Sequence, residues 1–135
     1  MILQTTLCLA AAAAVLNFWL GFRISQLRHG LKVSVGDGGR EPIMRRMRAQ
    51  ANFNENVPIT LLLFGLVEAT GTHAFWGGVW IAPLGALFLL GRIAHAYGME
   101  NDTSFKAGRP IGVITAMLAQ LVLIVAALLI ALGKI

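Results

Sequence analysis

The chain has 135 residues, of which 57% are hydrophobic and only 13% are charged, and its formal net charge is +5. Soluble proteins carry roughly 25% charged residues, so this composition excludes an ordinary water-soluble domain and indicates a surface that mostly meets lipid. Nucleic-acid binding is excluded as well, because the basic residues lie in connections beside apolar segments, where they set membrane topology. The length predicts one domain over residues 1–135.

The first predicted membrane helix covers residues 3–22, with Asn17 as its polar interior residue. Its length is near the ~20 residues that a helix needs to cross the hydrocarbon. Because no basic segment opens the chain, we expect a retained helix and not a cleaved signal peptide. Cys8, the single cysteine, lies in this apolar segment and is expected to pack as a small apolar residue, with no internal disulfide.

The second predicted helix is long and only partly apolar. Its apolar part, residues 57–67, is too short to cross the bilayer alone, but the helical pattern extends backwards, so one helix is expected over residues 42–70. Pro42 suits the first turn of this helix, Pro58 is expected to bend it, and Gly71 is expected to end it.

Two further membrane helices are predicted over residues 75–97 and 110–132. Gly98 is expected to end the third helix, and a polar connection leads to the fourth. Aromatic residues that suit membrane interfaces lie near both ends of the third helix: Trp76, Trp80 and Tyr97. The expected fold class is therefore an all-α membrane protein, a four-transmembrane-helix bundle.

The distribution of basic residues predicts the orientation in the membrane. The connection around Gly71 holds no Lys or Arg, whereas the first and third connections and the helix starts beside them hold Arg28, Lys32, Arg40, Arg45, Arg46, Arg48, Lys106 and Arg109. By the positive-inside rule these two connections are cytoplasmic and both termini lie outside, with Lys134 as a single exception.

The start of the second helix carries an unusual polar face. Arg48, Asn52 and Glu55 fall within an arc of about 60° at roughly 100° per residue, so they share one side of the helix where it enters the hydrocarbon. Ionisable groups at that depth are costly and normally face a bundle interior or a polar cavity. This face predicts a polar site at the membrane boundary, although Arg48 and Glu55 could also neutralise each other across helices.

Other polar side chains are expected to reach the same cytoplasmic end. Arg92 and His95 lie one turn apart near the end of the third helix, with Tyr97 beside them, and Arg109 and Arg28 flank other helices. Structural alternatives remain open for each. Arg92 could extend to the headgroups, His95 could be a packing residue, and Arg109 could contact phospholipid. Glu68, at the opposite end of its helix, is expected to cap or anchor that end.

The chemistry of these residues favours an anionic polar ligand. Arginine guanidinium groups bind carboxylates, while Glu55 and Asn52 could hold an ammonium or an amide. Glutathione, with two carboxylates, one ammonium and two amides, fits this set, but composition does not distinguish it from other polar ligands. No spacing of metal ligands, nucleophile elbow or phosphate-binding loop occurs in the sequence.

Several motifs resemble the MAPEG family, the membrane-associated proteins of eicosanoid and glutathione metabolism. The first is Arg48-Ala-Gln-Ala-Asn52-Phe-Asn-Glu55 followed by Pro58. The stretch Gly91-Arg92-Ile-Ala-His95-Ala-Tyr97-Gly98 resembles the end of the family's third helix, and Arg109-Pro110 resembles the start of its fourth. The segment from Lys32 to Gly39 resembles bacterial members, and together the motifs extend over nearly the whole chain.

This resemblance implies a four-helix subunit that assembles as a homotrimer, with glutathione bound as co-substrate between subunits near the cytoplasmic face of a bacterial inner membrane. Arg48, Asn52 and Glu55 would bind the tripeptide, assisted by the set Arg28, Arg92, His95 and Tyr97. Arg109 matches the arginine that is proposed in the family to stabilise the glutathione thiolate, the catalytic role. The implied activity is a transferase or peroxidase that acts on lipophilic electrophiles or hydroperoxides arriving through the bilayer.

The chain departs from the family's enzymes at three places. Met99 stands where those enzymes carry a tyrosine seven residues after the third-helix arginine, and Tyr97 is two residues early, about 160° away on the helix. Asn56 stands where some members carry a tyrosine, and the stretch from Arg92 to Arg109 is slightly longer. A non-catalytic relative that holds a lipid or a partner protein is the alternative. A small multidrug transporter is disfavoured, because its first helix would need an acid.

Overall fold

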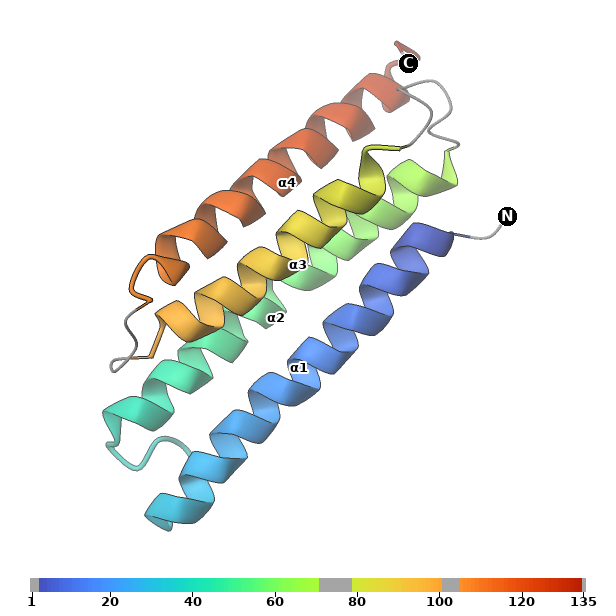
Figure 1. Cartoon of the computed structure of the whole chain (residues 1–135). Coiled ribbons are helices and arrows are strands. Elements are labelled where there is room, and N and C mark those ends of the chain that lie inside the picture. Colours follow the sequence, from blue (N-terminus) through green and yellow to red (C-terminus); the bar gives the residue numbers. More distant parts are fainter. Residues whose placement is uncertain (1–2, 71–78, 101–104, 135) are drawn as a thin grey trace.

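Four α-helices make up the fold, in a computed structural model that describes residues 3–70, 79–100 and 105–134. They are α1 (Gln4–Leu31), α2 (Glu41–Ala69), α3 (Ile81–Gly98) and α4 (Gly108–Ala131). The helices alternate in direction within one bundle, where α1 packs mainly on α2 and α3 mainly on α4 (Figure 1). The described residues contain no strand, so the predicted all-α, four-helix fold is confirmed.

Helix α1 is longer than the sequence predicts, since it continues from Phe22 to Leu31. Its 28 residues give a length of about 42 Å, more than the ~30 Å of hydrocarbon. Hydropathy marks where a helix leaves the apolar layer, and this helix remains intact beyond that point. It ends at Lys32, whose left-handed backbone (φ 54°) lets Val33 N–H donate to the Arg28 carbonyl at 2.9 Å.

Helix α2 matches its prediction to within one residue at each end. Pro42 lies in the first turn, where a backbone N–H has no helical partner, and Glu41 forms an ion pair with Arg45 at 2.6 Å. The helix continues through Pro58 without a break, and Gly71 lies outside the described residues. By length and composition α1, α3 and α4 suit a membrane span, whereas α2 is too charged in its first half.

Helix α3 begins at Ile81, later than the predicted residue 75, although residues 75–78 lie outside the described part. Pro83 explains this start, because a proline is tolerated in a first turn but clashes with any earlier helical turn. Gly98 is the last residue of α3, so the helix ends one residue after the predicted end at Tyr97. Helix α4 begins two residues before its prediction, so Arg109 lies inside its first turn.

Glycines bring α3 and α4 close together. A Cβ atom at Gly91 would collide with the Thr115 side chain, and one at Gly112 would collide with His95 and with the Gly91 carbonyl. Small residues let membrane helices approach in this way. The core beside this contact is built from fully buried side chains of three helices, Phe64, Phe88 and Leu123. Exposed apolar residues are spread along α1 and α4, as expected for surfaces that meet lipid.

Glu68 links the end of α2 to the start of α1. Its carboxylate accepts hydrogen bonds from the backbone N–H groups of Thr5 (2.9 Å) and Thr6 (2.8 Å) and from the Thr6 hydroxyl (2.6 Å). The first N–H groups of a helix have no helical partner and favour a negative charge. Glu68 therefore caps the start of α1 from the end of α2, whereas the sequence predicted a cap or anchor at the end of its own helix.

Candidate functional site

The alternating helix directions gather the predicted polar residues at one end of the bundle. The end of α1, the start of α2, the end of α3 and the start of α4 meet there, and the chain termini lie at the opposite end (Figure 1). All eight predicted site residues lie in these segments: Arg28, Arg48, Asn52, Glu55, Arg92, His95, Tyr97 and Arg109. Their environments differ, and they fall into separate groups.

The Arg48, Asn52 and Glu55 face of α2 is open. Arg48 and Glu55 are exposed and Asn52 is half-buried. Within the described residues neither Arg48 nor Glu55 forms an ion pair, so the two charges do not neutralise each other in a single chain. They are unpartnered charges on a helix of a membrane protein, available to a ligand or to another subunit.

Arg92 lies behind this face. Its side chain is 4% exposed and crosses from α3 to α2 and α4, where Nη1 donates to Asn52 Oδ1 at 2.8 Å and Nη2 donates to the Gly112 carbonyl. The guanidinium also lies 5.8 Å from the ring centroid of Phe88. Arg92 thus points into the bundle and away from the headgroups, and Asn52 is the predicted site residue to which it donates a hydrogen bond.

His95 is buried against α4. It is 5% exposed, and Gly112 provides the space for its Cβ, because a side chain at that position would collide with it. His95 is therefore a packed side chain, and it lies one helical turn after Arg92 on α3. Arg109, in contrast, is exposed in the first turn of α4, at the same end of the bundle.

Tyr97 belongs to a second polar cluster, on the α1 side of α3. Its ring lies 5.5 Å from that of Trp19, and the Arg23 guanidinium lies 4.4 Å from the Trp19 ring and 5.1 Å from the Tyr97 ring. Arg23 is 8% exposed and forms an ion pair with Glu100. The cluster therefore places Tyr97 among aromatic and cationic neighbours.

Arg46 completes this cluster, which we call the Arg23–Glu100 cluster (Trp19, Arg23, Arg46, Tyr97 and Glu100). Arg46 Nε lies 2.8 Å from Glu100 Oε1, and its Nη1 donates to the Arg23 carbonyl at 2.7 Å. Sequence reasoning missed this cluster. The spacing of Trp19 and Arg23 by one helical turn was a signal, but the acid partner lies 77 residues away.

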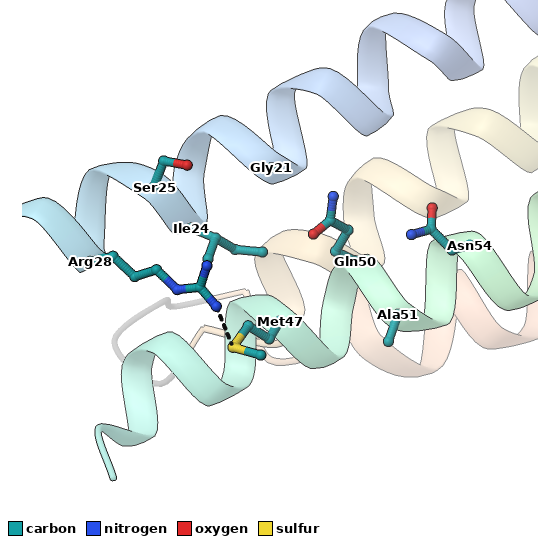
Figure 2. A pocket seen from close by; sticks show the side chains of 8 residues that line it. All are labelled: Gly21, Ile24, Ser25, Arg28, Met47, Gln50, Ala51 and Asn54. Atoms are coloured by element: carbon teal, nitrogen blue, oxygen red, sulfur yellow. Dashed lines mark hydrogen bonds between the residues drawn. The ribbon is translucent and has the colours of Figure 1, made fainter. Parts of the chain in front are cut away.

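A groove of about 390 Å³ separates α1 and α2 near Arg28 (Figure 2). Arg28 crosses it, donating through Nε to the Gly36 carbonyl at 2.9 Å and through Nη2 to Met47 Sδ at 3.5 Å. Gln50 and Asn54 line the same groove from α2, and Gln50 also donates to Asn17 at 3.3 Å. The full lining is Gly21, Ile24, Ser25, Arg28, Met47, Gln50, Ala51 and Asn54.

This groove gives α2 a second polar side that sequence reasoning missed. At roughly 100° per residue the α2 residues that line the groove are centred about 120° from the Arg48 face, so the two point in different directions from the helix. The signal was the spacing of Gln50 and Asn54 by one turn. Among the residues that the structure describes, no three His, Cys, Asp or Glu side chains lie together as metal ligands would.

Comparison with known proteins decides the family. The profile of the MAPEG family matches residues 6–129, which include most of every helix. The chain belongs to the MAPEG family. It is therefore a membrane protein of the family that takes its name from eicosanoid and glutathione metabolism, and the resemblance found from sequence is confirmed.

Curated relatives of this MAPEG chain include the "Inner membrane protein YecN" of Escherichia coli strain K12 and the protein of the same name in Escherichia coli O6:H1. The identity to each is 29% over 93 residues, which is 68% of this chain and 67% of the relative. No solved structure matches the chain significantly. The family assignment thus rests on the profile, and neither relative's name states a reaction.

Proposed function

We propose that this MAPEG protein binds glutathione at the Arg48, Asn52 and Glu55 face. The thiolate of the bound glutathione then attacks lipophilic electrophiles or hydroperoxides. The observation that carries the proposal is the exposure of Arg48 and Glu55 without an ion-pair partner among the described residues. Unpaired charges at a membrane boundary are costly, and a zwitterionic ligand with several carboxylates offsets that cost.

A homotrimer would complete the site. Arg48 and Glu55 point about 120° away from the groove side of α2, where Arg28 lies, and neither of them lines the groove of their own chain. A neighbouring copy that places its groove against the Arg48 face would add Arg28 to the ligand site. The exposed apolar residues of α1 and α4 offer surface for both subunit contact and lipid.

Arg109 is proposed to act on the thiol. A guanidinium close to a thiol lowers the pKa of that thiol and favours the thiolate, which is the nucleophile. In conjugation, the sulfur forms a bond to the electrophilic carbon and the leaving group departs. With a hydroperoxide, the thiolate takes the terminal oxygen and an alkoxide leaves, and a second glutathione then reduces the sulfenic acid to disulfide and water.

The proposed location is a bacterial inner membrane, with the site towards the cytoplasm and both termini outside. Two observations support it: the relatives are named inner membrane proteins, and cations are concentrated at the end of the bundle opposite the termini. Among the described residues Lys134 is the exception at the terminal end.

Purified protein tests the proposal. Glutathione binding by calorimetry and conjugation of a generic aryl halide are measured for wild type and for Glu55→Gln, with Glu68→Gln at the opposite end of α2 as the matched control. We expect binding and turnover in wild type, an affinity about tenfold weaker with correspondingly lower turnover in Glu55→Gln, and no loss of either in the control. Absence of glutathione binding by wild type would refute the proposal.

Arg109→Ala tests the thiolate role separately. Its glutathione affinity should stay within several-fold of wild type while the near-ultraviolet absorbance of the bound thiolate disappears, because the lost interaction stabilises the anion and not the rest of the tripeptide. A collapse of affinity would instead make Arg109 a binding residue.

A second candidate function is a non-catalytic relative that binds a lipid or a partner protein in the same place. The observations that favour it are Met99 and Asn56, where family enzymes carry tyrosines, and the engagement of Tyr97 with Trp19 and Arg23. Glutathione binding without any turnover of aryl halide or hydroperoxide would select this candidate.

A further inference from the structure

A buried cation without an acid lies directly behind the ligand face. The two hydrogen-bond acceptors of Arg92 are neutral, Asn52 Oδ1 and the Gly112 carbonyl, and no described carboxylate forms an ion pair with it. Its Nε is also buried and has no hydrogen-bond partner among the described residues. A guanidinium remains charged in proteins, so Asn52 lies between an uncompensated positive charge and the surface.

Arg92 also determines how the Asn52 amide is turned. The oxygen and nitrogen of an asparagine amide exchange places by a simple flip, and only the partner decides between them. A guanidinium has donors and no acceptor, so the atom that faces Arg92 at 2.8 Å must be Oδ1. The Nδ2 group is then on the other branch of a half-buried side chain, whose one side-chain hydrogen bond within the described part of the chain is that of Oδ1 with Arg92.

We infer that Arg92 is a positioning residue. By holding Oδ1 of Asn52 it leaves the Nδ2 group free to act as a hydrogen-bond donor. Asn52 therefore donates to a carboxylate or carbonyl oxygen of the ligand and does not bind its ammonium. This inference rests on the proposed function and sharpens it. Arg48, one turn earlier on the same face, is also a donor, and the buried charge behind Asn52 adds attraction for an anion.

Asn52→Asp separates this role from a purely structural one. Asp has the same shape and forms an ion pair with Arg92, so a structural role predicts an equal or higher melting temperature and unchanged glutathione affinity. Under our inference the outer atom becomes an acceptor with a negative charge, which repels the ligand oxygen that Nδ2 had bound. The melting temperature should hold while glutathione affinity falls by about tenfold or more.

Arg92 variants provide the second arm. Arg92→Lys keeps a charged donor for Asn52 Oδ1 and should retain glutathione affinity to within about threefold. Arg92→Met removes the donor, leaves the amide free to flip, and should weaken binding by about fivefold or more. Because a buried charge without an acid is removed, its melting temperature should not fall.

The full-length protein in detergent is used throughout, with glutathione binding measured by calorimetry and melting followed by circular dichroism. Asn52→Asp that binds glutathione as tightly as wild type overturns the inference and leaves the proposed function standing. A melting temperature that falls together with affinity shows that the substitution disturbs the fold instead of changing a hydrogen-bond donor, and it overturns the inference as well. If wild type does not bind glutathione, both ideas fail. If Arg92→Met does not fold, Asn52→Asp decides alone.

Discussion

Two polar regions lie at the same end of this bundle, and they differ in how their charges are matched. In the Arg23–Glu100 cluster two arginines share one carboxylate, and the aromatic rings of Trp19 and Tyr97 enclose Arg23. On the Arg48 face the cation and the acid are both exposed and lack ion-pair partners among the described residues. The first arrangement joins α1, α2 and the end of α3. The charges of the Arg48 face are instead available to a ligand or to another subunit.

This difference shows how arginines that stabilise the fold can be distinguished from arginines that are available to bind a ligand. Every one of these arginines looks alike in sequence, because each follows or enters an apolar segment. Paired charges stabilise the fold, and their loss should appear in unfolding. Unpaired charges at the surface contribute little to the fold, and their loss should appear in binding. The acids Glu100 and Glu55 make the sharpest test.

The largest effect is expected for Glu100→Gln. Its loss leaves Arg23 buried and Arg46 half-buried with no acid among the described residues to pair with, so the free energy of unfolding should fall by about 3 kcal/mol. Denaturant titration in detergent measures it. Glu55→Gln is the matched control and should unfold like wild type. Equal stability of the two variants would remove the distinction between the regions.

Gly112→Ala should have the next largest effect. A Cβ atom there collides with His95 and with the Gly91 carbonyl, and backbone cannot move aside easily, so we expect a loss of about 2 kcal/mol in stability. Because the Gly112 carbonyl also accepts from Arg92, glutathione affinity should fall too. Ala119→Gly, at another buried small residue of α4, controls for helix propensity, and it should not change affinity.

Glu55→Gln should reverse the pattern of Glu100→Gln. The acid that matches a ligand ammonium is lost, so glutathione affinity should fall by about tenfold while the unfolding curve stays in place. Calorimetry and denaturant titration on the same preparation check both halves. A stability loss equal to that of Glu100→Gln would show that Glu55 is paired in the assembled protein.

Glu68→Gln should have the smallest effect. The amide side chain still accepts one hydrogen bond at the start of α1 but loses its charge, which should cost about 1 kcal/mol of stability. Glutathione affinity should not change, since Glu68 lies at the far end of α2. A loss of affinity would show that the two ends of the bundle are coupled.

The helices themselves were largely predictable, because apolar segments of about membrane length and the turn residues between them are local signals. The predicted helix bounds are wrong where the helix and the apolar segment do not begin or end at the same residue. Helix α1 continues through the polar stretch after Phe22 to Leu31, and α3 begins where Pro83 lies in its first turn. The gathering of the site residues at one end follows directly from the alternating directions of the helices.

The roles of individual arginines were not predictable, because they depend on partners far away in sequence. Nothing local shows that Arg92 turns inward to Asn52, 40 residues earlier, or that Arg23 meets Glu100. The Arg48 face was found because its spacing is local to one helix. The groove side of α2, with Gln50 and Asn54, was overlooked since amides at that spacing are common on solvated helices.

The cap on α1 has a consequence for how the protein is made. The first turn of α1 leaves the ribosome long before Glu68 does, so during synthesis the backbone N–H groups of Thr5 and Thr6 lack the carboxylate that binds them in the finished protein. The first helix reaches its final state only after the second has entered the membrane and brought Glu68 alongside. The two helices therefore mature as one hairpin during insertion, and a truncation that ends before Glu68 removes the bond that closes it.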